Sequence, residues 1–201
     1  MTDQSAATLE KDGRIPPRAR ILRAAADLFY RHGIRAVGVE AIAEAAGTNK
    51  MTLYRHFASK DELVAEYLRQ WASSVDACWD RYAHALPGDP LAQLRAWLKE
   101  VAGRLAAPDE RGCALANAAI ELPEKDHPAR RVIEEFKRAQ RTKLARLSEA
   151  AGLDESEMLA DELHLLLEGA RVTAQSVGTE GLAARLLRMG EALIAAHKPR
   201  H

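Results

Sequence analysis

The stretch NKMTLYRHF, residues 49–57, gathers side chains that can bind a polar polymer. Its polar side chains are the Asn49 amide, the Lys50 amine, the Thr52 hydroxyl, the Tyr54 phenol, the Arg55 guanidinium and the His56 imidazole. Such groups form hydrogen bonds with phosphate oxygens and with the edges of nucleic-acid bases. The residue types therefore suggest contact with a nucleic acid.

The same stretch predicts a short helix with one buried side. At about 100° per residue, Leu53 and Phe57 fall on the same side. The opposite and lateral positions hold Met51, Thr52, Tyr54 and Arg55. The helix start adds free backbone amides beside Asn49 and Lys50, which suit phosphates and base edges. We therefore expect a recognition helix that lies in a major groove.

Two further helices precede this one and position it. Pro16 and Pro17 favour the start of a first helix, which ends at His32-Gly33. A second short helix carries Val39, Ile42, Ala43 and Ala46, and Gly47 supplies the turn into the third. Three helices within about 45 residues, the last two joined by a glycine turn, are typical of a helix-turn-helix.

Helical periodicity continues to the end of the chain and predicts an all-α fold of about nine helices. SKDE, residues 59–62, matches a capping box that starts a fourth helix near residue 60, running towards residue 85. Five more helices are expected. The first spans about 90–107, and the next four end near residue 122, at residue 150, near residue 177 and near the C-terminus. We predict a flexible arm at 1–14, a DNA-binding domain at 15–60 and a helical ligand-binding and dimerisation domain at 61–201.

The charge of the chain is zero overall but unevenly distributed. Residues 14–60 hold nine basic and three acidic residues, whereas the remainder of the 201 residues is acidic. A basic module joined to an acidic one indicates that the first part meets a polyanion. Charge alone leaves open a surface that is uneven by chance.

Several classes of protein are not expected. No apolar run approaches the roughly 20 residues that span a bilayer, and the N-terminus lacks a signal-peptide pattern, so we expect a cytoplasmic protein without membrane contact. Cys78 and Cys113 form no metal-ligand spacing, and the seven histidines are scattered. Catalytic motifs are missing as well, so neither an enzyme nor a metal or cofactor site is predicted.

The segment RARILRAAADLFYRHGIRAVGVEAIAEAAGTNKMTLYRHFASKDELV, residues 18–64, closely resembles the DNA-binding domain of the TetR family of bacterial transcriptional regulators. The resemblance implies a homodimer that inserts two recognition helices into successive major grooves of a palindromic operator. It also implies a helical C-terminal domain that binds a small-molecule effector. Most often such a regulator is a repressor that the effector releases.

Carried over by motif position, the family assigns DNA contacts to individual residues. Tyr54, His56 and Lys60 are expected to contact phosphates. The residues expected to face the floor of the major groove are Asn49, Lys50, Met51, Thr52 and Arg55. The chain departs from the family at Gly38, where a serine or threonine is frequent, so we expect a backbone amide contact there. The alternative for Tyr54 and His56 is packing against the core.

The resemblance also places an effector cavity among the C-terminal helices. Large side chains that could line it are Trp71, Cys78, Trp79, Tyr82, Trp97 and Phe136. Each of them alone can equally be core. On the short sixth helix, Cys113, Asn117 and Glu121 share a face, and either join neighbouring helices or point into the cavity. Cys113 at a helix start could sense electrophiles as a thiolate or simply fill the core.

Two apolar stripes near heptad spacing mark the last two long helices. They consist of Leu163, Leu166, Ala170 and Ala174 on one helix and Leu182, Leu186, Met189 and Leu193 on the other. In the family this pair of helices forms the dimer interface, whereas an ordinary core would produce the same pattern. Two other functions stay open: a regulator controlled by a protein partner, and a ligand-binding helical protein without DNA affinity.

Overall fold

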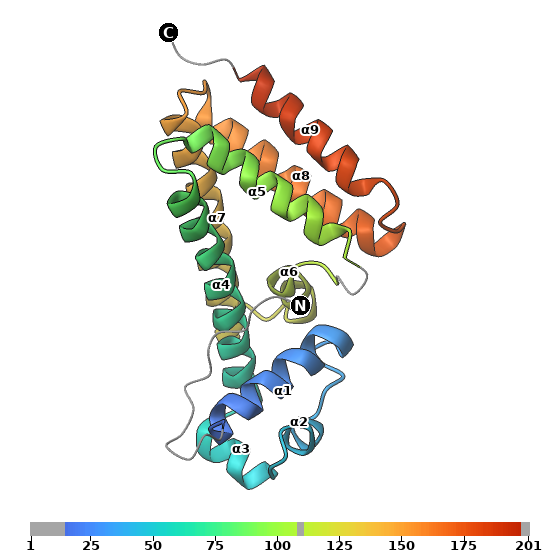
Figure 1. Ribbon diagram of the computed structural model, residues 1–201. Coiled ribbons are helices and arrows are strands. Elements are labelled where there is room, and N and C mark those ends of the chain that lie inside the picture. Colours follow the sequence, from blue (N-terminus) through green and yellow to red (C-terminus); the bar gives the residue numbers. More distant parts are fainter. Residues whose placement is uncertain (1–14, 108–110, 198–201) are drawn as a thin grey trace. The chain divides into compact units, whose positions relative to one another are not determined.

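The structure of the chain, a computed structural model, describes residues 15–107 and 111–197. Within these ranges the secondary structure consists of nine α-helices, which confirms the all-α prediction (Figure 1). In chain order they are α1 (Pro17–His32), α2 (Val39–Ala45), α3 (Lys50–His56), α4 (Lys60–Ala85), α5 (Pro90–Leu105), α6 (Ala114–Glu121), α7 (Pro128–Ala150), α8 (Ser156–Ser176) and α9 (Leu182–Ala196). The predicted arm at residues 1–14 lies outside the described residues.

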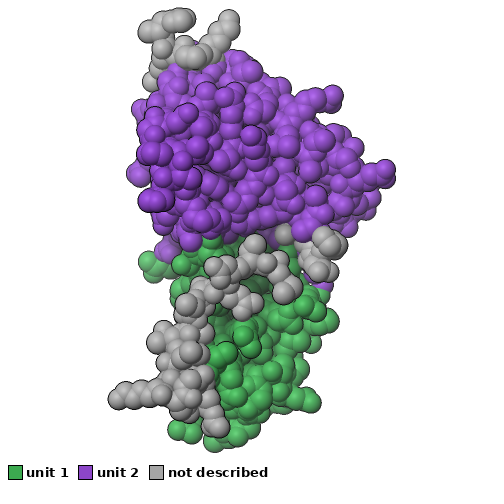
Figure 2. All heavy atoms as spheres, viewed as in Figure 1, with its two compact units in different colours: residues 1–74, 114–134 green, residues 75–113, 135–201 purple. Residues whose placement is uncertain are grey.

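The chain forms two compact units, coloured separately in Figure 2. Unit 1 comprises residues 1–74 and 114–134, and unit 2 comprises residues 75–113 and 135–201. Unit 1 therefore holds α1, α2, α3 and α6, together with the first half of α4 and the start of α7, residues 128–134. The predicted boundary at residue 60 falls inside this unit, because the first turns of α4 are buried there at Leu63, Val64 and Leu68.

The core of unit 1 holds the three short N-terminal helices together. α1 packs on α2 and α3, and α2 packs on α3. The Phe29 ring lies 5.8 Å from the Tyr67 ring of α4, measured between centroids. Almost no surface is left on the buried side chains that join the helices, namely Ile21, Ala25, Ile42, Leu53, Phe57 and Leu63. This packing fixes the direction in which the opposite side of α3 points.

Local signals set the ends of these helices. Pro17 occupies the first turn of α1, where a missing N–H costs nothing. At the start of α4, the Glu62 amide donates to Ser59 Oγ at 3.0 Å, which confirms the predicted capping box. The Glu62 carboxylate accepts from the Ala58 amide at 2.8 Å. Both contacts satisfy amides that a helix start would leave unpaired.

Unit 2 is a helical bundle in which α9 packs on both α5 and α8. Its core combines α4, α5, α7, α8 and α9. At one crossing the helices approach so closely that a Cβ atom at Gly190 would lie 2.5 Å from the Leu98 Cδ2 atom. Only glycine fits there without displacing a buried leucine.

The two apolar stripes predicted for the dimer interface face this core. Leu163, Ala170 and Leu186 belong to it, Leu182 is buried as well, and Leu166, Ala174 and Leu193 pack against it. Of the eight residues, only Met189 exposes half of its surface. The four buried residues, Leu163, Ala170, Leu182 and Leu186, are therefore corrected from dimer contacts to core residues, whereas a dimer contact of the partly buried residues and of Met189 stays a prediction. Heptad spacing marks an apolar face, and here the chain itself covers that face.

Candidate DNA interface and candidate effector site

The turn before α3 and the N-cap residue of that helix orient the recognition side. Gly47 has φ +61°, a left-handed conformation that favours glycine, and the Thr48 amide closes the turn by donating to the Ala43 carbonyl at 2.9 Å. Asn49 caps α3, because its side-chain oxygen accepts from the Thr52 amide at 2.9 Å. The carbonyl of the Asn49 side chain is thereby already used within the protein.

The outward side of α3 is as exposed as the sequence predicts. Met51 is 75% and Tyr54 42% exposed, whereas Leu53 and Phe57 are buried. Among the other residues assigned to DNA, Thr52 is half-buried and the exposed ones are Asn49, Lys50, Arg55 and His56. The predicted orientation is thus confirmed, and the contact with DNA itself remains a prediction.

Lys50 has an acidic partner on α2. Its Nζ atom lies 2.7 Å from Glu40 Oε1, and both side chains are more than half exposed. The hydrogen bond to Glu40 raises the pKa of Lys50, and the same bond lowers the pKa of the Glu40 carboxyl. Sequence reasoning missed Glu40, although its position among only three acids in residues 14–60 was a visible signal.

Gly38 caps α2 with its backbone alone. Its φ of −83° is one that any residue adopts, and no side chain caps the helix. The Ile42 amide donates to the Gly38 carbonyl at 3.3 Å, which is the first bond of the helix. One of the earlier amides of α2, that of Glu40, already lies beside the Glu40 carboxylate, and the phosphate contact through this backbone stays a prediction.

Lys60 is engaged inside unit 1. Its Nζ atom donates to the Ile34 carbonyl at 2.6 Å and lies 5.9 Å from the centroid of the Phe29 ring. Burial lowers the pKa of this amine. The side chain therefore links α4 to the loop after α1, and the predicted phosphate contact would have to use its remaining donors.

A second link joins that loop to α6 through Glu121. The Arg35 amide donates to the Glu121 carboxylate at 3.0 Å, and Arg35 Nε donates to the Glu121 carbonyl at 2.7 Å. Arg35 also pairs with Glu124 at 3.2 Å. Glu121, a candidate for either a structural or a ligand-binding role, thus has structural contacts, and sequence alone could not have paired it with a residue 86 positions away.

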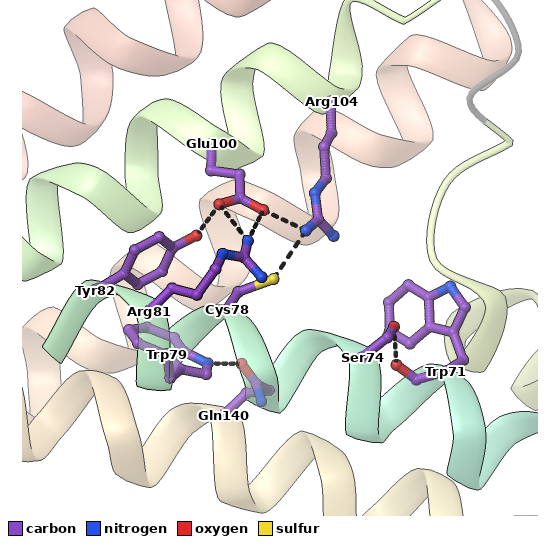
Figure 3. A network of polar contacts seen from close by, with 9 residues as sticks. All are labelled: Trp71, Ser74, Cys78, Trp79, Arg81, Tyr82, Glu100, Arg104 and Gln140. Atoms are coloured by element: carbon purple, nitrogen blue, oxygen red, sulfur yellow. Dashed lines mark hydrogen bonds and ion pairs between the residues drawn. The ribbon is translucent and has the colours of Figure 1, made fainter. Parts of the chain in front are cut away.

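Four of the predicted effector residues of unit 2, namely Cys78, Trp79, Tyr82 and Trp97, belong to an aromatic and polar cluster, and Figure 3 shows the first three of them. The Trp79 and Trp97 rings are stacked with centroids 6.0 Å apart, and Tyr82 meets Trp79 edge-on at 5.8 Å. Trp79 Nε1 donates to Gln140 Oε1 at 2.8 Å. Both tryptophans are buried. These three aromatic residues pack on one another in the core of unit 2.

Glu100 is the centre of the polar part of this cluster (Figure 3). Its carboxylate accepts hydrogen bonds from Tyr82 and Arg104 and lies 3.4 Å from Arg81. Burial, followed by the bond to Glu100, raises the pKa of Tyr82. Arg104 also donates to the Cys78 sulfur at 3.1 Å. Neither Glu100 nor Arg104 was identified from the sequence, because each becomes notable only beside Cys78 and Tyr82.

The remaining effector candidates are not gathered into this cluster. Trp71 and Asn117 are half-buried and belong to unit 1. Phe136 and Cys113 are buried and belong to unit 2. Cys113 is only 1% exposed, which favours its packing role over that of a reactive thiol.

Two kinds of site are not found in the part of the chain that the structure describes. No group of three or more histidine, cysteine, aspartate or glutamate side chains there could hold a metal ion. None of the helices searched in that part has the length and apolar character to cross a membrane.

Comparisons with known proteins agree with this geometry. The model of the family described as bacterial regulatory proteins, tetR family, matches residues 21–67. The repressor KstR2 of Mycobacterium tuberculosis is 48% identical over 52 residues, which are 26% of this chain and 26% of KstR2. The regulator AcrR of Shigella flexneri is 35% identical over 78 residues, 39% of this chain and 36% of AcrR. The alignments thus span roughly a quarter to a third of these curated relatives.

Solved structures match over nearly the whole chain. SCO4454, a TetR-family regulator from Streptomyces coelicolor, has a TM-score of 0.85 and 28% identity over 90% of this chain and 95% of its own. A putative TetR regulator, sav143 from Streptomyces avermitilis, has a TM-score of 0.78 and 32% identity over 92% of this chain and all of its own.

A helix-turn-helix with an exposed polar recognition helix, joined to a helical bundle, defines a DNA-binding transcriptional regulator. The chain belongs to the TetR family of bacterial regulatory proteins. The resemblance found in residues 18–64 is thereby confirmed.

Proposed function

We propose that this protein is a cytoplasmic repressor without catalytic activity, which leaves its operator when a small molecule occupies unit 2. The observation that carries this proposal is the outward side of α3, which is exposed and polar while its opposite side is anchored in the core. KstR2, which is similar over 52 residues, is a transcriptional repressor, and this supports repression here. Binding by two copies to a palindromic operator completes the proposal.

On the DNA, residues of unit 1 divide into two groups. We assign base contacts in the major groove to Asn49, Lys50, Met51, Thr52 and Arg55, and phosphate contacts to Tyr54, His56, Lys60 and the backbone amides that follow Gly38. Base contacts distinguish sequences, whereas phosphate contacts supply affinity for all of them. Because Asn49 already caps α3, its NH2 group is the part available to a base.

The dimer surface is proposed on the exposed side of α8, with Met189 of α9. Met158, Leu165 and Val172 are 54%, 70% and 62% exposed and follow one another at seven-residue intervals, so they form a line along α8. Apolar side chains exposed in a row mark a protein contact. A second copy of the chain presents the same row, as a twofold interface requires.

The effector site is proposed in unit 2, near the aromatic and polar cluster of Trp79, Tyr82, Trp97 and Glu100. Aromatic walls with a few polar groups are typical of small-molecule sites. An effector that inserts there would separate the stacked tryptophans. Quenching of tryptophan fluorescence on titration with candidate compounds would support this placement.

The experiment that tests DNA binding is fluorescence anisotropy with a duplex from upstream of the gene, at increasing salt. We expect binding that weakens steeply with salt, because phosphate contacts release counterions. Arg55→Ala and Lys50→Ala should each lose about 1–3 kcal/mol on the operator and little on random DNA. Arg188→Ala, an exposed arginine of α9, is the matched control and should bind normally. Absence of salt-sensitive binding to any palindromic fragment would overturn the proposal.

A further inference from the structure

The ion pair between Glu40 and Lys50 places a negative charge on the surface that should attract DNA. Glu40 lies in the first turn of α2 and its side chain is 68% exposed. It holds the Lys50 ammonium at 2.7 Å, at the start of the recognition helix. Residues 14–60 otherwise contain only two acids against nine basic residues.

The stability of the fold does not explain the ion pair between Glu40 and Lys50. Ion pairs between two well-exposed side chains contribute little to folding, because water and salt screen them. The Glu40 carboxylate also lies in the first turn of α2, beside its own backbone amide, where a phosphate contact is proposed. A carboxylate there repels the same phosphate, and it neutralises the cation that could bind it.

We propose that Glu40 is a specificity-determining residue that acts through Lys50. It is an internal anion that competes with DNA phosphates for the Lys50 ammonium. On random DNA, Lys50 exchanges the Glu40 carboxylate for a phosphate, so its contact adds little binding free energy. The Glu40 carboxylate also repels the phosphates of the DNA backbone. On the operator, Lys50 can keep one hydrogen bond to Glu40 and direct its other donors to base acceptors such as guanine O6 and N7. Glu40 thus weakens non-specific binding more than operator binding.

This inference rests on the proposed function, and the test keeps the two separate. Full-length wild type, Glu40→Gln, Lys50→Gln and the double variant would be titrated, at several salt concentrations, against a selected operator duplex and a random duplex. Glu44→Gln is the matched control, since it removes one exposed carboxylate from the same helix one turn later. Thermal melting would verify that every variant is folded.

For Glu40→Gln we expect random DNA to bind about two- to fivefold tighter per half-site, the range that an exposed ion pair can supply. Operator affinity should change less than about twofold. The salt dependence on random DNA should steepen by about one unit per half-site, because Lys50 gains a phosphate. The gain should vanish in the Lys50→Gln background and should not occur in Glu44→Gln.

Four results would overturn the inference while leaving DNA binding intact. An equal gain on both duplexes, or the same gain in Glu44→Gln, would indicate a general charge effect. A loss confined to the operator would indicate that Glu40 itself contacts a base. Persistence of the gain without Lys50 would exclude action through that residue. If the wild type binds neither duplex, the proposed function fails first.

Discussion

At the scale of single residues, the DNA-facing surface combines side chains that are free with others that are already engaged. Arg55 and Met51 are exposed, whereas Asn49 caps a helix and Lys60 links α4 to the loop after α1. A substitution at an engaged residue therefore changes stability together with affinity. This distinction decides which variants report on DNA contacts alone.

Gly38→Ser is expected to raise both the stability of the protein and its affinity for DNA. The backbone at Gly38 is compatible with any residue, and a Cβ atom would meet only a Glu40 oxygen at an ordinary 3.6 Å. A serine hydroxyl can cap α2, which should add a few tenths of a kcal/mol of stability, roughly the gap between serine and glycine caps. It should also tighten binding to all DNA sequences. Gly47→Ser, at φ +61°, is the control and should lower the melting temperature.

His197 makes the attachment of α9 depend on pH. Its Nδ1 lies 2.8 Å from the Asp154 carbonyl and its Nε2 2.9 Å from the Glu162 carboxylate, both acceptors, so both ring nitrogens must carry protons. Burial opposes this charge, but the bonds to Glu162 and Asp154, with the nearby Glu155 charge, outweigh burial and raise the pKa of His197.

Because this pKa is raised, the stabilisation is fully present below the ordinary pKa of 6.5 and is lost as pH rises through the folded-state value. Urea unfolding of wild type and His197→Gln across this window should show a stability difference that shrinks at higher pH. A difference that is constant with pH would mean that the charged ring does not anchor α9.

At the scale of helices, those features that depend on local signals could be predicted from the sequence. Caps and turns such as Gly47, Asn49, Ser59 and Asp89-Pro90 act within a few residues, so the helices and the outward side of α3 followed from the chain alone. The four buried residues of the α8 and α9 stripes were misassigned, because spacing shows that a face is apolar and cannot show which partner covers it.

Gly190→Ala tests the close approach of α9 and α5. The added methyl group would overlap Leu98, which is buried and has little room to move, so we expect a loss of about 1–3 kcal/mol. Gly103→Ala on α5 is the matched control, since no atom lies within 4 Å of its Cβ position, and it should gain up to about 1 kcal/mol. Chemical denaturation of both variants makes the comparison. Equal stability of the two would contradict the packing argument.

At the scale of the whole molecule, folding brings together contacts that no local pattern reveals. The side-chain contacts that sequence reasoning could not supply join residues brought together only by folding, as in Glu40–Lys50, Arg35–Glu121, Glu100–Tyr82 and His197–Glu162. The family resemblance predicted that two domains exist and what they do. It could not predict that α6 belongs with the DNA-binding unit.

Assembly is predicted to depend on the exposed side of α8. Leu165→Asp combined with Val172→Asp places charge where two copies would meet, so we expect single chains of 22.1 kDa in analytical ultracentrifugation and loss of operator binding. Ile120→Asp changes an equally exposed apolar residue on α6 and should leave the dimer intact. If the α8 variant still sediments as a dimer, the interface lies elsewhere.

Two copies of α3 are predicted to read an inverted repeat. The measurement that tests this is selection of bound duplexes from a random pool, because it needs no knowledge of the natural operator. We expect enrichment of two inverted half-sites whose centres lie about one helical turn, or about 10 base pairs, or a multiple of it apart. With Arg55→Ala, preference should relax at one position of each half-site. A wild-type selection that enriches no inverted repeat would contradict the account.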